Sequence, residues 1–212
     1  MRYEQWEPIY QQILDDFGFS RWRDEEAAKL LSELLRESKN HLEDAFRLVC
    51  GRTVVVCGNG PSLAQGLKAL SSQDHIFIAA DGATEVLLKQ GITPQIVVTD
   101  LDGPFHAILQ ANKMGSIIVV HAHGDNIDAT LKYVPKLNNV IGTTQSRPLK
   151  NIYNFGGFTD GDRCVFLAKT LCAAEIKLVG FDYDDESVTP RKRKKLAWAK
   201  RLIETALSED QC

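Results

Sequence analysis

The sequence has little that would place the protein in a membrane or on nucleic acid. No apolar run approaches the ~20 residues needed to cross a bilayer, and residues 1–6 lack the apolar segment of a secretory signal. The formal net charge of -3 offers no excess of Lys and Arg, on which general nucleic-acid affinity depends. We therefore expect a cytoplasmic protein that has neither nucleic acid nor membrane as a partner.

Cysteine is also sparse and irregularly spaced. The five cysteines show no CxxC spacing and are odd in number, so neither a disulfide framework nor a zinc site is expected. Buried free thiols in a reducing compartment are the better expectation. The residues concerned are Cys50, Cys57, Cys164, Cys172 and Cys212.

The N-terminal part of the chain reads as helical. The 212 residues, of which 44% are hydrophobic, suffice for one main domain with a real core and an appendage. Residues 3–17 form one expected helix, and a second begins near Asp24-Glu25-Glu26, whose acids suit the positive end of a helix dipole. We expect residues 1–50 to be an N-terminal helical segment that either caps the main domain or makes a contact in a homodimer.

From residue 51 to residue 212 the pattern predicts a doubly wound α/β domain. Near-continuous apolar runs alternate with helical stretches, which indicates a mostly parallel sheet covered on both faces. In such sheets ligands bind beyond the carboxyl ends of the strands. The expected strands are 53–56, 76–79, 96–98, 117–120, 140–141 and 176–179, and the expected helices lie near 62–70, 83–90, 104–113, 125–132, 160–173 and 191–207.

The most informative stretch, Thr99-Asp100-Leu101-Asp102-Gly103, follows the third expected strand. Residues two apart along an extended chain project to the same side, so Asp100 and Asp102 are expected to aim two carboxylates at one spot. Bare carboxylates would repel each other. Mg²⁺ removes the conflict, because it favours carboxylate and phosphate oxygens. The alternative is a solvated turn, since Asp and Gly are common turn residues.

Two further loops carry candidate nucleotide contacts. After the first strand, small residues would let backbone N–H groups approach a phosphate at the positive end of the next helix; the alternative is a tight strand-to-helix turn. After the second strand, Asp81 either caps the next helix or binds ribose hydroxyls or the metal. The candidate residues in these loops are Gly58, Asn59, Gly60, Ser62, Asp81 and Gly82.

The remaining strand ends carry polar residues that each fit more than one role. His121 and His123 fit a metal pair, a phosphate contact or structural hydrogen bonds. Asp125 either joins the metal shell, acts as a base or begins a helix. In the loop Phe155-Gly156-Gly157-Phe158-Thr159-Asp160-Gly161-Asp162-Arg163, the two Phe either flank a flat heterocycle or pack in the core. There Asp160 or Asp162 would contact a ring or metal, and Arg163 a phosphate.

The run Arg191-Lys192-Arg193-Lys194-Lys195 opens the last expected helix, where positive charge opposes the helix dipole. Such runs are usually solvated faces. The alternative is a phosphate contact, for which Lys194 and Lys195 are the candidates.

Together these segments resemble the archaeal 6-hydroxymethyl-7,8-dihydropterin pyrophosphokinase family over residues 52–207. The resemblance rests on Gly58–Ser62, Ala80–Ala83, Thr99–Gly103, His121–Asn126 and Phe158–Arg163. The paired acids and the Ala-Asp-Gly segment are also similar to thiamine pyrophosphokinase.

The resemblance implies a Mg²⁺- and ATP-dependent enzyme of tetrahydromethanopterin- or folate-type pterin synthesis. The pterin hydroxymethyl oxygen would attack the β-phosphorus of ATP, and AMP would leave. Asp100 and Asp102 would hold Mg²⁺, with Asp125 as a further catalytic candidate. His123, Thr159, Asp160, Asp162 and Arg163 join the candidate substrate contacts.

Two other classes of function remain open. The Gly-Asn-Gly-Pro-Ser-Leu segment is similar to one in some bacterial sialyltransferases, so a nucleotide-dependent glycosyltransferase is one alternative, although it would not require the paired acids in the same way. A non-catalytic nucleotide- or pterin-binding module is the other, although binding alone does not need so many carboxylates near phosphate.

Overall fold

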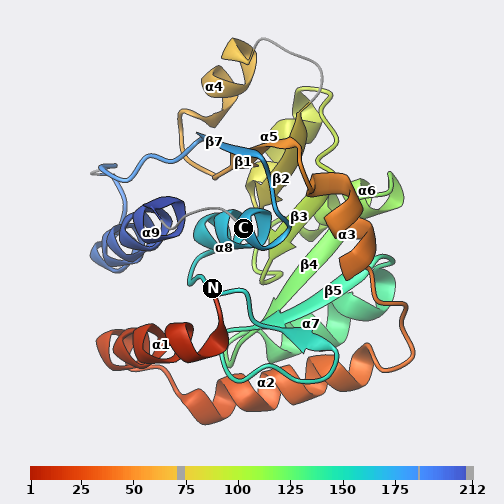
Figure 1. Ribbon diagram of the computed structural model, residues 1–212, viewed down its shortest axis with the longest axis vertical. Coiled ribbons are helices and arrows are strands. Elements are labelled where there is room, and N and C mark those ends of the chain that lie inside the picture. The colour runs from red at the N-terminus through yellow and green to blue at the C-terminus, as the bar shows by residue number, and fades with distance from the viewer. Residues whose placement is uncertain (71–74, 186, 209–212) are drawn as a thin grey trace.

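A parallel sheet forms the centre of the protein in this computed structural model, which describes residues 1–70, 75–185 and 187–208 (Figure 1). Within those residues the sheet has seven strands in the order β6-β5-β4-β3-β2-β1-β7, and every neighbouring pair is parallel. The strands are β1 (Thr53–Cys57), β2 (Ile76–Ala80), β3 (Ile96–Thr99), β4 (Ile117–Ala122), β5 (Val140–Thr144), β6 (Ile152–Tyr153) and β7 (Glu175–Val179).

Helices cover both faces of this sheet, which confirms the predicted doubly wound α/β fold. They are α1 (Tyr3–Phe17), α2 (Arg21–Leu34), α3 (Leu42–Val49), α4 (Leu63–Ala69), α5 (Ala83–Lys89), α6 (Phe105–Lys113), α7 (Ile127–Tyr133), α8 (Asp160–Thr170) and α9 (Pro190–Ser208), with a 3₁₀ turn at Val134–Lys136. The predicted strands and helices are all present, with shifted ends. The second helix begins at Arg21, ahead of the predicted acidic start, and the short strand β6 was not predicted.

Alternate residues of each strand serve opposite cores. Val54 and Val56 of β1 pack in a core with α1, α3, α8 and α9. Val55 and Cys57 pack on the other face with α4 and α5. The more distant strands on that second face pack against α2, α6 and α7. Because side chains alternate along a strand, an uninterrupted apolar run can fill two cores at once.

The N-terminal helices belong to these same cores. Trp6 and Tyr10 of α1 are fully buried. The Trp6 indole Nε1 donates a hydrogen bond to the Gln145 carbonyl oxygen at 2.8 Å, just past the end of β5. The segment ends with α3 at Val49, shortly before β1 begins at Thr53. It therefore caps the sheet, the first of the two roles expected of it.

The cysteines only partly follow the expectation of buried thiols. Cys57 and Cys164 are buried and free. For Cys50 the expectation is wrong, because this free thiol lies exposed at the end of α3, and Cys172 is partly exposed. Cys212 lies outside the described residues. Among the described helices, none combines the length and the apolar character needed to cross a membrane.

Replacing Trp6 by Ala should lower the free energy of unfolding by about 3–5 kcal/mol, because it opens a cavity in the sheet core and removes a buried hydrogen bond. Urea unfolding followed by circular dichroism measures the change. Trp22→Ala is the matched control, because Trp22 lies on α2 and is 68% exposed. Equal stability of the two variants would contradict the packing of α1 into the core.

Candidate functional site

A cavity of about 480 Å³ opens at the carboxyl edge of the sheet. The loops after β1, β2, β3, β4 and β7 line it, together with the N-terminus of α8. Helix α9 and the α1–α2 connection close it from the side of the N-terminal segment. This is the edge at which doubly wound sheets bind ligands. Most of the residues singled out in the sequence line the cavity, whereas Ser62, His121 and Asp162 do not.

Asp81, at the end of β2, is fixed by the end of β3. The Thr99 hydroxyl donates to Asp81 Oδ2 at 2.7 Å and accepts a hydrogen bond from the Leu101 N–H at 2.8 Å. The Gly103 N–H also donates to Asp81 Oδ2, at 3.3 Å. A Cβ at Gly103 would collide with this carboxylate, so glycine is required here for the close approach. The second oxygen, Asp81 Oδ1, is buried and has no hydrogen-bond partner.

The backbone beyond β3 corrects one premise of the sequence reasoning. The chain is not extended between Asp100 and Asp102, because Leu101 has a φ of 66° and turns its side chain into the core. A left-handed Leu is strained and persists only where its surroundings fix it. The two carboxylates nevertheless lie close enough for each to shift the pKa of the other. A tight turn, rather than strand alternation, brings them together.

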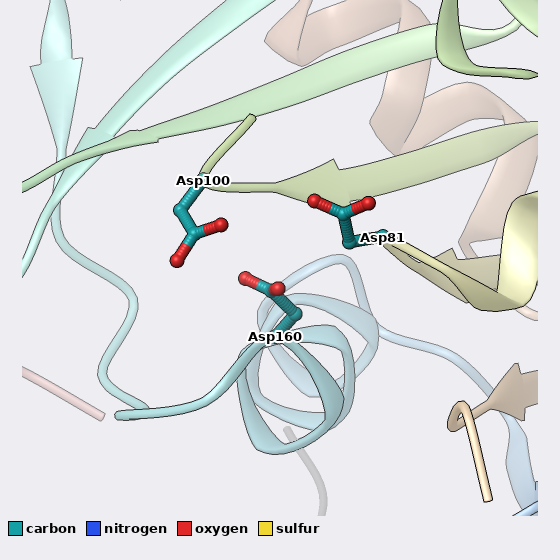
Figure 2. A group of neighbouring side chains, drawn as sticks. All are labelled: Asp81, Asp100 and Asp160. Atoms are coloured by element: carbon teal, nitrogen blue, oxygen red, sulfur yellow. The ribbon is translucent and has the colours of Figure 1, made fainter. Parts of the chain in front are cut away.

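Three carboxylates converge in the cavity: Asp81, Asp100 and Asp160. One ligand oxygen from each lies within 4.8 Å of the others, and Figure 2 shows the side chains around a common space. They come from the ends of β2 and β3 and from the first residue of α8. Asp102, predicted with Asp100 as the metal pair, is not among the three and is more exposed than any of them, although it is still partly desolvated.

The pKa values of these acids reflect crowding of negative charge. Burial, and then the charge of Asp100, raise the pKa of Asp160 well above its usual value. Burial likewise raises the pKa of Asp81, although the Thr99 hydrogen bond opposes it. Burial and the Asp100 charge raise the pKa of Asp102 to about 6. Burial acts to raise the pKa of Asp100. The hydrogen bonds from His123 and Asp102, together with the nearby Arg163 charge, outweigh burial and hold that pKa below its usual range.

The cluster fits a hard divalent cation. Mg²⁺ takes oxygen ligands in a compact octahedral shell and keeps several waters, so a few convergent carboxylate oxygens suffice. The unpartnered Asp81 Oδ1 is an acceptor that a cation would satisfy. A cation would also relieve the mutual repulsion that otherwise disfavours the charged forms.

His123 orients Asp100. Its Nε2 lies 3.2 Å from Asp100 Oδ2, while its Nδ1 accepts a hydrogen bond from the Asp125 N–H at 3.3 Å. That acceptor role assigns the proton to Nε2, which then donates to Asp100. Asn126 was not predicted as a site residue, although it ends the His121–Asn126 segment. Its side-chain amide donates to the backbone carbonyl oxygens of both Asp100 and His121 at 2.7 Å.

His121 and Asp125 have different surroundings from His123. His121 is buried with Nδ1 at 3.2 Å from the Thr143 hydroxyl, and burial lowers its pKa well below the usual value. Its ring centroid lies 6.1 Å from that of His123, and within the described residues neither histidine joins the carboxylate group. Asp125 is exposed at the cavity and lies 3.8 Å from Arg23. The structure thus favours structural hydrogen bonding over a histidine metal pair.

The glycine loop after β1 is held by an acid after β7. The Ser62 N–H and hydroxyl both donate to Asp182 Oδ2, at 3.0 and 2.8 Å. A Cβ at Gly60 would collide with that carboxylate. Gly58, Asn59 and Gly60 line the cavity, whereas Ser62 does not. On the neighbouring strand end, a Cβ at Gly82 would collide with the Asn59 side chain, so the two loops pack closely.

The loop before α8 divides its polar residues between structure and cavity. Thr159 and Asp162 form a capping box, in which the Asp162 carboxylate accepts hydrogen bonds from the backbone N–H groups of Phe158 and Thr159. Asp162 is fully buried and is not among the cavity-lining residues. Thr159, Asp160 and Arg163 do line it. Arg163 donates to Asp160 Oδ1 at 3.2 Å, and its Nε is buried without a partner.

The two Phe residues of the same loop, Phe155 and Phe158, have different surroundings. Phe158 lines the cavity and packs against Phe17, with ring centroids 5.0 Å apart. Phe155 does not line the cavity and stacks on Tyr153 instead, at 5.6 Å.

Comparisons with known proteins show the family of this chain. Residues 25–187 match the family described as 6-hydroxymethylpterin diphosphokinase MptE-like. The chain belongs to this MptE-like family. Curated relatives named 6-hydroxymethyl-7,8-dihydropterin pyrophosphokinase come from Pyrococcus furiosus (43% identical) and Methanothermobacter thermautotrophicus (46%), each covering 96% of this chain and 94% of the relative. A relative of that name from Methanocaldococcus jannaschii is 40% identical over 96% of this chain and 95% of its own.

Family membership confirms the resemblance drawn from the motifs and extends it. That resemblance was placed on residues 52–207, whereas the relatives align with 96% of the chain and the family match begins at residue 25. The N-terminal helices therefore belong to the shared MptE-like protein rather than to a separate addition.

The N-terminal segment reaches the site through Asp24, which sequence reasoning read only as a helix-dipole acid. Asp24 is buried on α2 and lines the cavity. Its carboxylate accepts hydrogen bonds from the Tyr10 hydroxyl at 2.7 Å, the Gln145 side chain at 2.8 Å and the Gly124 N–H at 2.8 Å. Gln145 in turn accepts a long hydrogen bond from Arg163 at 3.4 Å. The signal in the sequence was spacing, because Asp24 shares a helix face with the buried Ala27, Ala28 and Leu31.

Replacing Asp24 by Ala should lower the free energy of unfolding by about 2–4 kcal/mol, because three buried donors lose their acceptor. It should also lower diphosphokinase turnover, since Gly124 and Gln145 line the same cavity as the three carboxylates. Thermal melts and steady-state assays measure the two effects. Glu26→Ala, an exposed acid on the same helix, is the control. An Asp24→Ala protein as stable as that control would refute the structural role of this network.

Proposed function

We propose that this chain transfers diphosphate from ATP to the hydroxymethyl group of 6-hydroxymethyl-7,8-dihydropterin and releases AMP, with Mg²⁺ held by the carboxylate cluster. The family and the names of the relatives support the acceptor and the reaction class. The observation that carries the proposal is the convergence of Asp81, Asp100 and Asp160 within 4.8 Å in the cavity. The product would serve tetrahydromethanopterin- or folate-type pterin synthesis in the cytoplasm.

The proposed reaction is an in-line displacement at phosphorus. The acceptor oxygen forms a bond to the β-phosphorus of ATP, the bond from that phosphorus to the bridging oxygen breaks, and the electron pair leaves with AMP. When bound, Mg²⁺ neutralises charge on the phosphate oxygens. The protein mainly positions the two substrates and stabilises developing charge, as in other phosphoryl transfers.

The residues take distinct roles in this proposal. His123 and Asn126 hold Asp100 in an ionised, fixed position, which suits a metal ligand. Asp102 has a pKa of about 6, which suits it to accept the proton that the acceptor hydroxyl loses. The loop Gly58–Gly60 and Arg163 contact the nucleotide phosphates. Asp125, exposed at the cavity, stays a candidate for a further catalytic contact. Asp102 also stays a candidate metal ligand.

An assay for AMP formation from ATP tests the proposal. AMP should appear only when the hydroxymethyldihydropterin and Mg²⁺ are both present, and EDTA should abolish it. Transfer to thiamine instead would indicate the thiamine-type alternative, and a requirement for a sugar nucleotide would indicate a glycosyltransferase. Tight binding of ATP or pterin with no turnover would indicate a binding module, and any of these three results would overturn the proposed reaction.

Replacing Asp100 by Asn should lower kcat by at least about a hundredfold, because the central carboxylate of the cluster loses its charge. The melting temperature should change little, because Asn has nearly the shape of Asp and its side-chain oxygen can still accept the hydrogen bond from His123. The matched control is Asp128→Asn, an exposed acid in the first turn of α7 outside the cavity. Turnover near the wild-type rate in Asp100→Asn at saturating Mg²⁺ would exclude the assigned role.

A further inference from the structure

One lysine of the basic run on α9 lies in the cavity. The buried residues of α9 recur at helical spacing and include Trp198, Ala199 and Leu202. Lys195 lies three and four residues before the first two of these, so it belongs to the same face of the helix. Arg191 and Lys192, one turn earlier, line the cavity with it. The phase of this helix therefore directs three of the five basic residues to the site.

The Lys195 ammonium has no ion-pair partner there. Within the described parts of the chain, no carboxylate lies within salt-bridge distance of its Nζ, and its close contact is the Phe158 ring, with the centroid at 5.8 Å. The side chain is only partly exposed. A partly desolvated cation without a hydrogen-bond acceptor is unfavourable unless a ligand supplies one.

The charges around Lys195 identify what such a ligand must be. Burial and the neighbouring Arg163 charge lower the pKa of Lys195, while the Asp100 charge opposes this. Arg163 and Lys195 line the same cavity as the three carboxylates. Arg163 pairs with Asp160 at 3.2 Å, so Lys195 is the cation left for a ligand among these described residues. A ligand that contacts both sets must carry several anionic oxygens and bind a divalent cation, which describes a metal-bound polyphosphate.

We propose that Lys195 binds the triphosphate of the nucleotide, as the cationic counterpart of the Asp81–Asp100–Asp160 cluster. This inference rests on the proposed function for the identity of the nucleotide. Lys195 contacts the β- or γ-phosphate, on the side of the triphosphate away from the carboxylates. It is therefore a substrate-binding residue contributed by α9, and AMP, which lacks those phosphates, does not depend on it.

The neighbouring Lys194 provides a matched contrast. Its Nζ donates to the Asp16 carbonyl oxygen at 2.7 Å and lies 3.3 Å from Asp16 Oδ1. It also lies 4.9 Å from the centroid of the Phe17 ring. Lys194 thus ties α9 to α1 and does not line the cavity. Of the two lysines that the sequence offered for phosphate contact, the structure leaves Lys195.

Titration calorimetry of three variants tests the inference. Lys195→Met should weaken binding of Mg²⁺–ATP by at least about tenfold, because a charge-assisted phosphate contact is lost. AMP affinity should change less than about twofold. Lys195→Arg should restore most of the Mg²⁺–ATP affinity, which a purely structural role would not require. Lys194→Met should bind Mg²⁺–ATP like the wild type. Met keeps the length and the apolar stem of Lys, and a thermal melt checks that each variant is folded.

The outcomes separate this inference from the proposed function. Equal Mg²⁺–ATP affinity in Lys195→Met and Lys194→Met would overturn it, even if the wild type transfers diphosphate to the pterin. An equal loss of AMP and ATP affinity in Lys195→Met would also overturn it. Selective loss of Mg²⁺–ATP affinity would support it, even if the pterin proves not to be the acceptor.

Discussion

Repulsion among carboxylates is the constraint around which the carboxyl edge of the sheet is organised. Asp81, Asp100 and Asp160 offer oxygens within 4.8 Å of one another in one cavity, where Asp81 is buried and the other two are half-buried. Like charges at such separations disfavour joint ionisation, and burial adds to the penalty. The fold nevertheless fixes Asp81 through Thr99 and Asp100 through His123. Such fixing is intelligible if a cation completes the set, because a preorganised oxygen shell then needs no rearrangement at the moment of reaction.

The rest of the architecture converges on that point from opposite faces of the sheet. The carboxyl ends of parallel strands lie at one edge of the sheet, so residues distant in sequence come together there. The N-terminal helices contribute a buried acid, Asp24, which anchors Gly124 and Gln145 behind the site. Helix α9 contributes cations to the same cavity, and Arg163 of α8 pairs with the cluster through Asp160. A polyanion with its metal would thus find both carboxylates and basic groups in this cavity.

The fold class and several site residues were predictable from the sequence. The other features depend on tertiary packing, which the sequence pattern does not show. The apolar runs predicted the fold class, and the acids that follow them pointed to Asp100. Both signals can be read from the local sequence. The prediction that residues 100–102 are extended was wrong at Leu101, because tertiary packing holds this residue in a left-handed conformation. Asp24 was overlooked because acids open many helices, and only its spacing to buried residues marked it. The strand Ile152–Tyr153 is too short for any pattern to signal. Lys195 could not be told from its neighbours until the packing of α9 set the helix phase.

The central claim is that the three carboxylates hold a divalent cation that carries the nucleotide triphosphate. Its most direct test is a crystal structure grown with Mn²⁺ and a non-hydrolysable ATP analogue, with data collected at the manganese absorption edge. The account predicts an anomalous peak within about 2.0–2.4 Å of oxygens from Asp81, Asp100 and Asp160, bridged to phosphate. An anomalous peak at the histidines, or a well-ordered triphosphate with no metal at these carboxylates, would contradict it.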